Sequence, residues 1–221
     1  MSDNPVSFLE QYKAPVNDWT GVANGVIGRS PLAHVGFDEL SRMTPSDAPV
    51  QLREHALQGH LTLRCNPDDA AQTAAFEAAT GLALPTAPLS SVASSDMTVR
   101  WIAPDEWLIS IAASALFALQ QRLQDALTGH CAVVDVSSGL TVFELSGERA
   151  VDVLKKCVPV DLHPRHFPAG KVVSTGFAKA SCTLRRLNNE TFELVVRRSF
   201  ADYIWLWLQD ASLEYGLRVE S

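Results

Sequence analysis

The chain of 221 residues is 47% hydrophobic and 19% charged, so it is long and apolar enough to bury a substantial core. Its formal net charge of −7 argues against a protein that binds nucleic acids or anionic membranes through basic surface charge. Because there is no run of 18 apolar residues, and the opening stretch MSDNPVSFLEQYK lacks the basic and apolar regions of a secretory signal, we expect a cytoplasmic protein with no membrane partner.

The first 50 residues show little hydrophobic periodicity, and we predict an irregular arm over residues 1–50. Three glycines occur in GVANGVIG (Gly21–Gly28), but their spacing is not G-x-G-x-x-G and no strand precedes them. A phosphate-binding loop is therefore not expected in the arm.

An internal duplication follows the arm. The stretch Thr98–Ala126 aligns without a gap over Thr183–Ala211 at a constant offset of 85 positions. A second match upstream, at an offset of 80, places Ala70 on Ala150. The identical pairs of the first match include Thr98/Thr183, Arg100/Arg185 and Asp125/Asp210.

Each copy is predicted to form a strand, a helix, two strands and a second helix, which is an α+β pattern. We therefore predict a tandem duplication of a strand-helix-strand-strand-helix unit, with antiparallel sheets and packed helices. The repeats span residues 51–130 and 131–221, and we expect them to form one compact domain.

The hairpin of the first repeat is centred on WIAPDEWLI (Trp101–Ile109), where two carboxylates lie between two tryptophans. Asp105 and Glu106 could form an acid/base pair, but Pro104 favours a turn, and the equivalent tip of the second repeat is Asn-Asn-Glu. A solvated turn supplies neither the burial nor the coupling that separates the pKa values of an acid/base pair. We predict a hairpin tip, with Trp107 facing the core or an interface.

The remaining elements follow in chain order. A helix with Ser114 as its N-cap follows the first hairpin. Strands at Cys131–Val136 and Leu140–Leu145 lead to a helix with Ser146 as a plausible N-cap. A second hairpin, Thr183–Arg197, turns at an Asn-Asn pair.

The last helix, SFADYIWLWLQDASLEY, is predicted to start at Ser199 as its N-cap. Trp205 and Leu206 fall outside its main apolar stripe, so the helix is expected to be buried on two sides, either in a core shared by the repeats or in a subunit interface. The stripe consists of Phe200, Tyr203, Ile204, Trp207 and Leu208.

Other reactive residue types occur without a recognisable catalytic pattern. His163 and His166 are close in HPRHFP, but Pro164 prevents a regular helix and no third metal ligand is near in sequence. No G-x-S-x-G motif frames the serines that follow Asp135 in DVSS. Four arginines near the second hairpin could bind an anion or an acidic partner, although a charged, solvated strand edge is commoner: Arg185, Arg186, Arg197 and Arg198.

The cysteines are widely spaced, so each is expected to be a small buried hydrophobic residue in a reduced protein. They are Cys65, Cys131, Cys157 and Cys182. From the residue chemistry we predict no catalytic, no cofactor-binding and no metal-binding residue in this chain, and a binding or assembly module.

Several strings resemble the gamma subunit of heterotetrameric sarcosine oxidase, and the likeness runs from about Ser30 to Gly216. The chain is more distantly similar to the folate-binding fold of the glycine-cleavage aminomethyltransferase, which is also an internally repeated α+β unit. The strings are SPLAH (Ser30–His34), VQLREHALQGHLTLR (Val50–Arg64), WIAPDEWLI, VVDVSSGLTVFELSGERAVDVLKKCVPVDL (Val133–Leu162) and RSFADYIWLWL (Arg198–Leu208).

The resemblance implies a complex that oxidatively demethylates sarcosine to glycine, reduces O₂ to hydrogen peroxide and passes the one-carbon unit to tetrahydrofolate. It implies alpha, beta and delta partner subunits, with FAD, FMN, NAD and folate associated with alpha and beta and zinc with delta. The gamma subunit carries none of these groups. Asp135 would match the aspartate of the folate-binding family's Asp-x-Ser motif, but no complete set of folate ligands accompanies it.

The leading hypothesis is a non-catalytic gamma subunit of an oxidoreductase complex of one-carbon metabolism. One alternative is a free-standing folate-binding protein or folate-dependent transferase. Another is a homo-oligomeric binding module with no enzyme partner.

Overall fold

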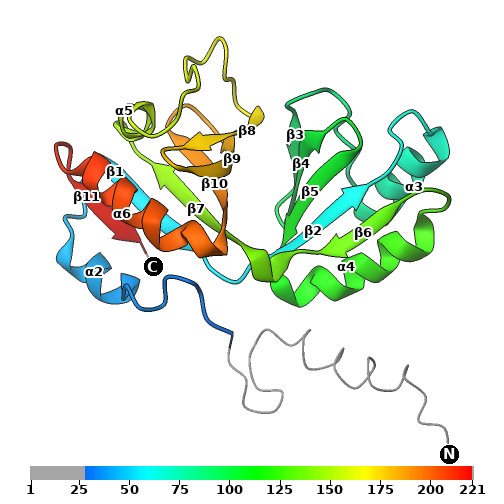
Figure 1. The fold of residues 1–221 in the computed structure, drawn as a ribbon, viewed down its shortest axis with the longest axis horizontal. Coiled ribbons are helices and arrows are strands. Elements are labelled where there is room, and N and C mark those ends of the chain that lie inside the picture. Colours follow the sequence, from blue (N-terminus) through cyan, green and yellow to red (C-terminus); the bar gives the residue numbers. More distant parts are fainter. Residues whose placement is uncertain (1–27, 221) are drawn as a thin grey trace, which may run out of the picture.

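Two β-sheets that face one another form the described part of the chain, residues 28–220 of a computed structural model (Figure 1). Each sheet builds a hydrophobic core with its own helices. A third, smaller apolar cluster of Leu108, Val142 and Val195 lies between the sheets. No helix of residues 28–220 is long and apolar enough to cross a membrane.

The larger sheet, called sheet A, has six strands and is antiparallel except for its outermost pair, β11 and β1. Three helices pack in the same half of the molecule: α2 (Phe37–Met43), α5 (Ala150–Lys155) and α6 (Ala201–Ser212). The strand order is β11 (Leu217–Glu220), β1 (Val50–His55), β7 (Leu140–Ser146), β10 (Thr191–Arg197), β9 (Ala180–Arg186) and β8 (Val172–Phe177).

The smaller sheet, called sheet B, has five antiparallel strands. Helices α3 (Ala70–Thr80) and α4 (Ala113–Ala126) pack against it, and the predicted α+β fold with antiparallel sheets and packed helices is thus confirmed. The strand order is β3 (Ser91–Ala93), β4 (Met97–Ala103), β5 (Glu106–Ile111), β2 (Gly59–Arg64) and β6 (Ala132–Asp135).

The two sheets exchange one strand. Strand β1 comes just before β2 in the chain but pairs with β7 in sheet A. Strand β6 comes just before β7 but pairs with β2 in sheet B. The expected boundary between residues 130 and 131 therefore does not separate the two sheets, because the first strand of each repeat belongs to the sheet that the other repeat builds.

This exchange makes the strands of the two sheets equivalent one by one. The five strands β1-β7-β10-β9-β8 of sheet A match the run β6-β2-β5-β4-β3 that makes up sheet B. Strand β11 is an addition to sheet A at the outer edge of β1.

The predicted N-caps are wrong in all three helices. Helix α4 begins at Ala113, so Ser114 lies inside its first turn, and α5 begins four residues after Ser146. Ser199 lies in a short 3₁₀ turn, Arg198–Phe200, that precedes α6. The side chain of Asp69 does cap a helix, since its Oδ1 accepts hydrogen bonds from the backbone N–H groups of the first turn of α3.

The predicted irregular arm contains one helix within the described residues, because α2 spans Phe37–Met43 and contacts β11. Of the glycine-rich stretch, residues 21–27 lie outside the described residues. Phe37 packs edge-on against Trp205, with 5.1 Å between the ring centroids, and Trp205 is buried. Trp205 is thus buried on the second side of the helix, whereas Trp207, a member of the predicted stripe, is 39% exposed in this chain.

Leu206 is 54% exposed, so the helix is not fully buried on its second side by this chain alone, and burial of that side in a subunit interface stays a prediction. The arm supplies the aromatic neighbour of Trp205, which the periodicity of the helix does not reveal.

Candidate functional site

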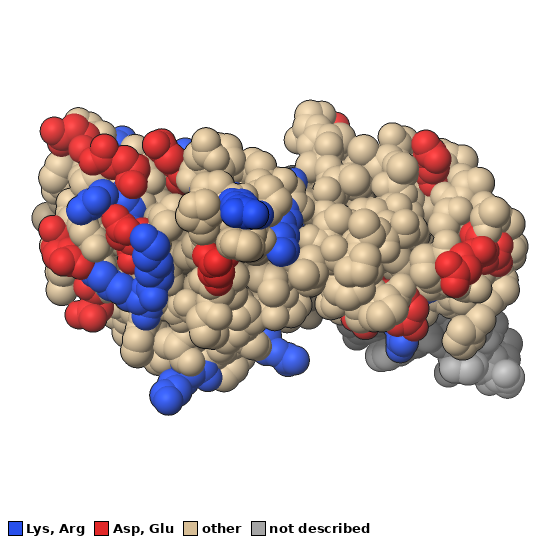
Figure 2. Space-filling view, turned by 90° about the horizontal axis from the view of Figure 1, so that it is seen from above, with Lys and Arg blue, Asp and Glu red and all other residues tan. Residues whose placement is uncertain are grey.

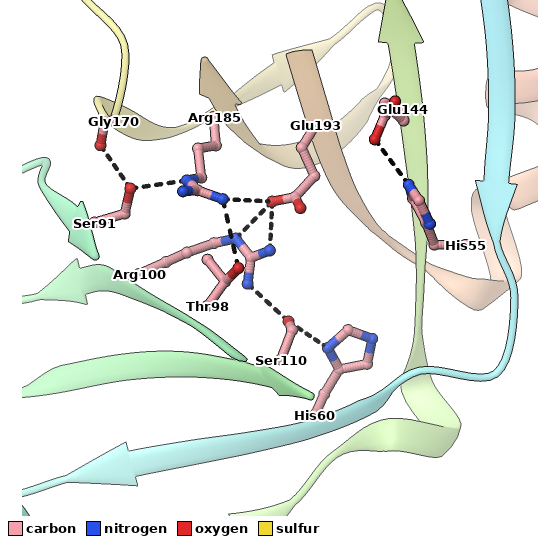
Figure 3. A network of polar contacts seen from close by, with 10 residues as sticks. All are labelled: His55, His60, Ser91, Thr98, Arg100, Ser110, Glu144, Gly170, Arg185 and Glu193. Atoms are coloured by element: carbon pink, nitrogen blue, oxygen red, sulfur yellow. Dashed lines mark hydrogen bonds and ion pairs between the residues drawn. The ribbon is translucent and has the colours of Figure 1, made fainter. Parts of the chain in front are cut away.

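The most buried cluster of charged side chains lies between the two sheets (Figure 3). Arg100 comes from β4 of sheet B, and Arg185 and Glu193 come from β9 and β10 of sheet A. The two arginine side chains point toward the same carboxylate (Figure 3). Their side chains are only 1% and 10% exposed, and that of Glu193 is 13% exposed.

Arg100 makes the strongest contacts in this network. Its Nε donates to Glu193 Oε1 at 2.9 Å, and its Nη2 donates to the same oxygen. Its Nη1 donates to the hydroxyl of Ser110 at 2.7 Å, and that hydroxyl lies 2.8 Å from Nδ1 of His60. Each of the three nitrogens of the Arg100 guanidinium therefore donates to an acceptor, which a buried cation requires.

Arg185 extends the network to the other side. Its Nη1 lies 3.8 Å from Glu193 Oε1, and its Nε donates to the hydroxyl of Ser91 at 2.8 Å. That hydroxyl donates to the carbonyl oxygen of Gly170 at 2.6 Å. Burial is the main cause that lowers the pKa of Arg185 from its ordinary value.

The duplication explains why two arginines meet here. Arg100 and Arg185 are an identical pair of the repeats, but the residue equivalent to Glu193 at the same offset of 85 is Leu108. The carboxylate of Glu193 is therefore the shared counter-ion of the two equivalent arginines. The predicted solvated strand edge is wrong for Arg185. Its neighbour Glu193 is the cross-strand partner within the predicted hairpin, whereas the contact of Arg100 with Glu193 has no local signal in the sequence.

Arg186 is also buried, contrary to the prediction of a solvated edge. Its guanidinium donates to four backbone carbonyl oxygens, at 2.8–3.0 Å. These carbonyls belong to the segment between α5 and β8 and to the Asn-Asn turn, so Arg186 links these two segments by hydrogen bonds. The carbonyls are those of Leu162, Phe167, Asn188 and Asn189.

His60 is held neutral at the end of the network. Burial, and then the positive charge of Arg100, lower the pKa of His60 to about 4, against a smaller opposing effect of Glu193. A neutral histidine beside a serine hydroxyl resembles a nucleophile and its base, but Arg100 already donates to that hydroxyl. Both side chains are buried and line none of the hollows described below. The arrangement stabilises the contact between the sheets.

Asp135 lies at the end of β6, where it organises a turn. Its Oδ1 accepts hydrogen bonds from the backbone N–H of Ser137 at 2.9 Å and from the Ser137 hydroxyl at 2.5 Å. The same hydroxyl oxygen accepts the backbone N–H of His60 at 2.9 Å. The Asp-Val-Ser segment thus joins β6, the 3₁₀ turn Ser137–Gly139 and β2.

The hairpin tip predicted at Asp105 and Glu106 is confirmed, since β4 ends at Ala103 and β5 begins at Glu106. Asp105 pairs with Arg64 at 2.6 Å, and both side chains are at least half exposed. Trp107 is fully buried, and its Nε1 donates to the carbonyl oxygen of Pro85 at 2.8 Å. The second hairpin also forms as predicted, with β9 ending at Arg186 and β10 beginning at Thr191.

The histidine pair and the cysteines are not brought together into a metal site. His163 and His166 lie on an exposed turn with 6.2 Å between their ring centroids. Within residues 28–220 no group of three or more His, Cys, Asp or Glu side chains is placed to hold a metal ion. All four cysteines are free; Cys65, Cys157 and Cys182 are buried as predicted, and Cys131 is half-buried.

Two hollows of about 500 and 450 Å³ adjoin where the sheets face one another. Both are lined by Leu108, Leu140, Thr183 and Arg197. A third hollow, of about 670 Å³, lies beside the first residue of β6, at the Arg64–Asp105 ion pair.

Comparisons with known proteins point to one family. The model of the sarcosine oxidase, gamma subunit family matches residues 64–214. A sarcosine oxidase subunit gamma of Corynebacterium sp. (strain U-96) is 36% identical over 191 residues, which is 85% of this chain and 91% of that protein. A sarcosine oxidase subunit gamma of Arthrobacter sp. is 34% identical over 190 residues, with the same coverage of both proteins.

Solved structures agree with the sequence relatives. A chain of the heterotetrameric sarcosine oxidase from Corynebacterium sp. U-96, in complex with pyrrole 2-carboxylate, superposes with a TM-score of 0.76 at 34% identity. The match covers 85% of this chain and 96% of that one. The glycine cleavage system aminomethyltransferase T from Bartonella henselae has a TM-score of 0.55 at 16% identity, covering 96% of this chain and 57% of that one, which shows a shared fold.

Proposed function

Because this chain belongs to the sarcosine oxidase gamma subunit family, we propose that it is the gamma subunit of a heterotetrameric sarcosine oxidase. The observation that carries the proposal is the extent of the match, since the chain covers nine-tenths or more of both the Corynebacterium relative and the superposed chain. The likeness therefore includes the whole subunit and not one shared module.

In this complex the partners are alpha, beta and delta subunits, and the reaction is the oxidative demethylation of sarcosine to glycine. Oxygen is reduced to hydrogen peroxide, and the one-carbon unit passes to tetrahydrofolate. FAD, FMN, NAD and zinc belong to the other subunits, and the complex is cytoplasmic. This chain supplies no catalytic, cofactor-binding or metal-binding residue.

A supporting role agrees with the chemistry of the buried network. Arg100, Arg185 and Glu193 contact one another or other protein groups, and none of them lines the hollows described above. A catalytic group must reach its substrate, within hydrogen-bond distance or through one water. The network instead joins the two sheets by buried contacts, which agrees with a subunit that presents a docking surface.

The distribution of charge supports docking to other subunits. Seen from above, most of the visible lysine and arginine side chains lie over the half built on sheet A, and a wide surface over sheet B shows no charged side chains (Figure 2). Between Ala70 and Ser95, Glu77 is the single charged residue in the sequence. Depletion of charge is the compositional mark of the buried centre of protein interfaces.

Co-expression tests the proposal. The chain produced alone is expected to be colourless and inactive toward sarcosine, and an affinity tag on it should retain flavin-bearing subunits with sarcosine-dependent peroxide formation when all subunits are co-expressed. Persistent failure of the flavin-bearing subunits to co-purify with the wild-type chain would overturn it.

The alternative of a free-standing folate-binding protein rests on the shared fold with the aminomethyltransferase. Titrating tetrahydrofolate into the isolated chain discriminates between the two. Saturable micromolar binding that is lost in Asp135→Ala and retained in Asp135→Asn, which preserves the acceptor for Ser137, would favour the alternative.

A further inference from the structure

Within residues 28–220, the two equivalent sheets differ by one whole strand, at the outer edge of β6. In sheet A, β11 pairs in parallel with the outer edge of β1, over Val50–Arg53. In sheet B the equivalent strand, β6, is the last strand within residues 28–220. The five equivalent strands are thus extended by a sixth strand in sheet A, whereas the matching edge of sheet B has no strand of residues 28–220 paired with it.

The backbone of β6 is set up for such pairing. The N–H of Val136 donates to the carbonyl oxygen of His60 at 2.9 Å, so this pair belongs to the hydrogen-bonded class of an antiparallel ladder. Because the classes alternate, the backbone groups of Val133 and Asp135 point away from β2. The carbonyl oxygen of Val133 accepts a long hydrogen bond, 3.4 Å, from the side chain of Gln124 on α4.

The side chains at this edge are unusually apolar for an exposed strand. Val134 is 51% exposed, and within residues 28–220 it is one of six large hydrophobic residues that are exposed. Its partner on β2, Thr62, lines the hollow between the sheets, so Val134 lies on the face of sheet B that is turned toward sheet A. Asp135, which ends the strand, is also exposed.

We propose that an extended segment of another subunit pairs in parallel with the outer edge of β6, as β11 does with β1, and completes sheet B as a six-stranded sheet. This inference rests on the proposed function, because it requires the complex. The segment needs about four residues, the length of β11, and donates to and accepts from the backbone of Val133 and Asp135.

The side chains at the two edges indicate the chemistry of the incoming segment. In β11, Val219 is buried and alternates with Arg218 and Glu220, and Glu220 pairs across the strands with Arg53 of β1 at 2.8 Å. At the edge of β6 the exposed charge is the carboxylate of Asp135. The faces differ between the two sheets, because Val219 packs beside Leu52 on the core face of sheet A, whereas the exposed Val134 lies on the face of sheet B turned toward sheet A. The side chains of β6 itself therefore define the incoming strand, which packs an apolar side chain on Val134 and carries a lysine or arginine near Asp135.

Hydrogen exchange tests the backbone pairing in the intact complex. The amides of the peptide that contains Val133–Asp135 are expected to exchange at least about tenfold more slowly in the purified complex than in the isolated chain. The amides of β11, already paired, should exchange alike in both samples. A complex that assembles with unchanged exchange in β6 would overturn the inference and leave the proposed function standing.

Cross-linking and one matched pair of variants identify the occupant. A photoreactive amino acid at position 134 should capture another subunit of the complex; capture of a second copy of this chain, or of this chain's own residues 1–27, would overturn the inference. Val134→Glu should weaken assembly about tenfold or more, whereas Leu213→Glu, at a 74% exposed position, should change it less than about twofold. Equal effects of the two variants would refute a specific role of the edge. Absence of any wild-type complex would instead count against the proposed function.

Discussion

Two arginines share one carboxylate between the sheets. We therefore predict that removing the carboxylate lowers the free energy of unfolding more than removing one of the arginines does. In Glu193→Ala, the guanidinium groups of Arg100 and Arg185 lose their shared counter-ion while staying buried. Breaking a buried ion pair by removing one partner costs about 3–5 kcal/mol, because it leaves an uncompensated charge. We expect Glu193→Ala to lie in this range.

In Arg100→Met the outcome differs, although Arg100 is the most buried charged side chain of the three. Removing this cation leaves one arginine with one carboxylate and relieves the repulsion between the two guanidinium groups. A methionine fills much of the same volume. We expect a loss below about 2 kcal/mol, clearly smaller than that of Glu193→Ala.

Urea unfolding at pH 7.5, followed by tryptophan fluorescence, measures both changes. With a slope of about 2–3 kcal/mol per molar for a chain of this size, Glu193→Ala should lower the midpoint by about 1–2 M. Glu193→Gln is the control, because it keeps an acceptor oxygen and should fall between the two variants. An Arg100→Met loss equal to or larger than that of Glu193→Ala would refute the idea that the carboxylate is the shared, limiting partner.

Three further predictions concern His60 and the first hairpin. The pKa of His60 is about 4 in the folded chain and about 6.5 in the unfolded chain, so the unfolded chain binds more protons between these pH values. Stability should therefore fall by up to about 3 kcal/mol as the pH drops from 6.5 to 4. In His60→Gln the urea midpoint should depend much less on pH in this range, and an unchanged pH dependence would contradict the assignment. Trp107→Ala should cost about 3–5 kcal/mol in urea unfolding because the indole is fully buried, whereas Trp207→Ala, at a 39% exposed position, should cost far less; similar losses would contradict the packing. Asp105→Asn combined with Glu106→Gln should leave sarcosine oxidation by the assembled complex almost unchanged, since Asp105 forms an exposed ion pair; a tenfold loss of activity would reinstate the acid/base reading of the hairpin.

The family, the α+β class and both hairpins could be predicted from the sequence, because their signals are local. Turn residues at Pro104 and at the Asn-Asn pair interrupt runs of strand-forming residues, and period-two alternation places Trp107 inside. Helix starts were predicted less well. The spacing of the serines predicts N-caps, but the first turns of α4 and α6 form without a side-chain cap.

The sequence by itself determined the duplication, and with it the equivalence of Arg100 and Arg185. Only the tertiary structure decided that Arg100 joins Arg185 at Glu193, because Arg100 and Glu193 are 93 positions apart and come together through the facing of two sheets, whereas Arg185 and Glu193 are partners in one hairpin. The same holds for the exchange of β1 and β6, and for the burial of Trp205 beneath Phe37 of the arm. Periodicity reports which face of an element is apolar, whereas the neighbour that covers this face is chosen by the packing of the whole chain.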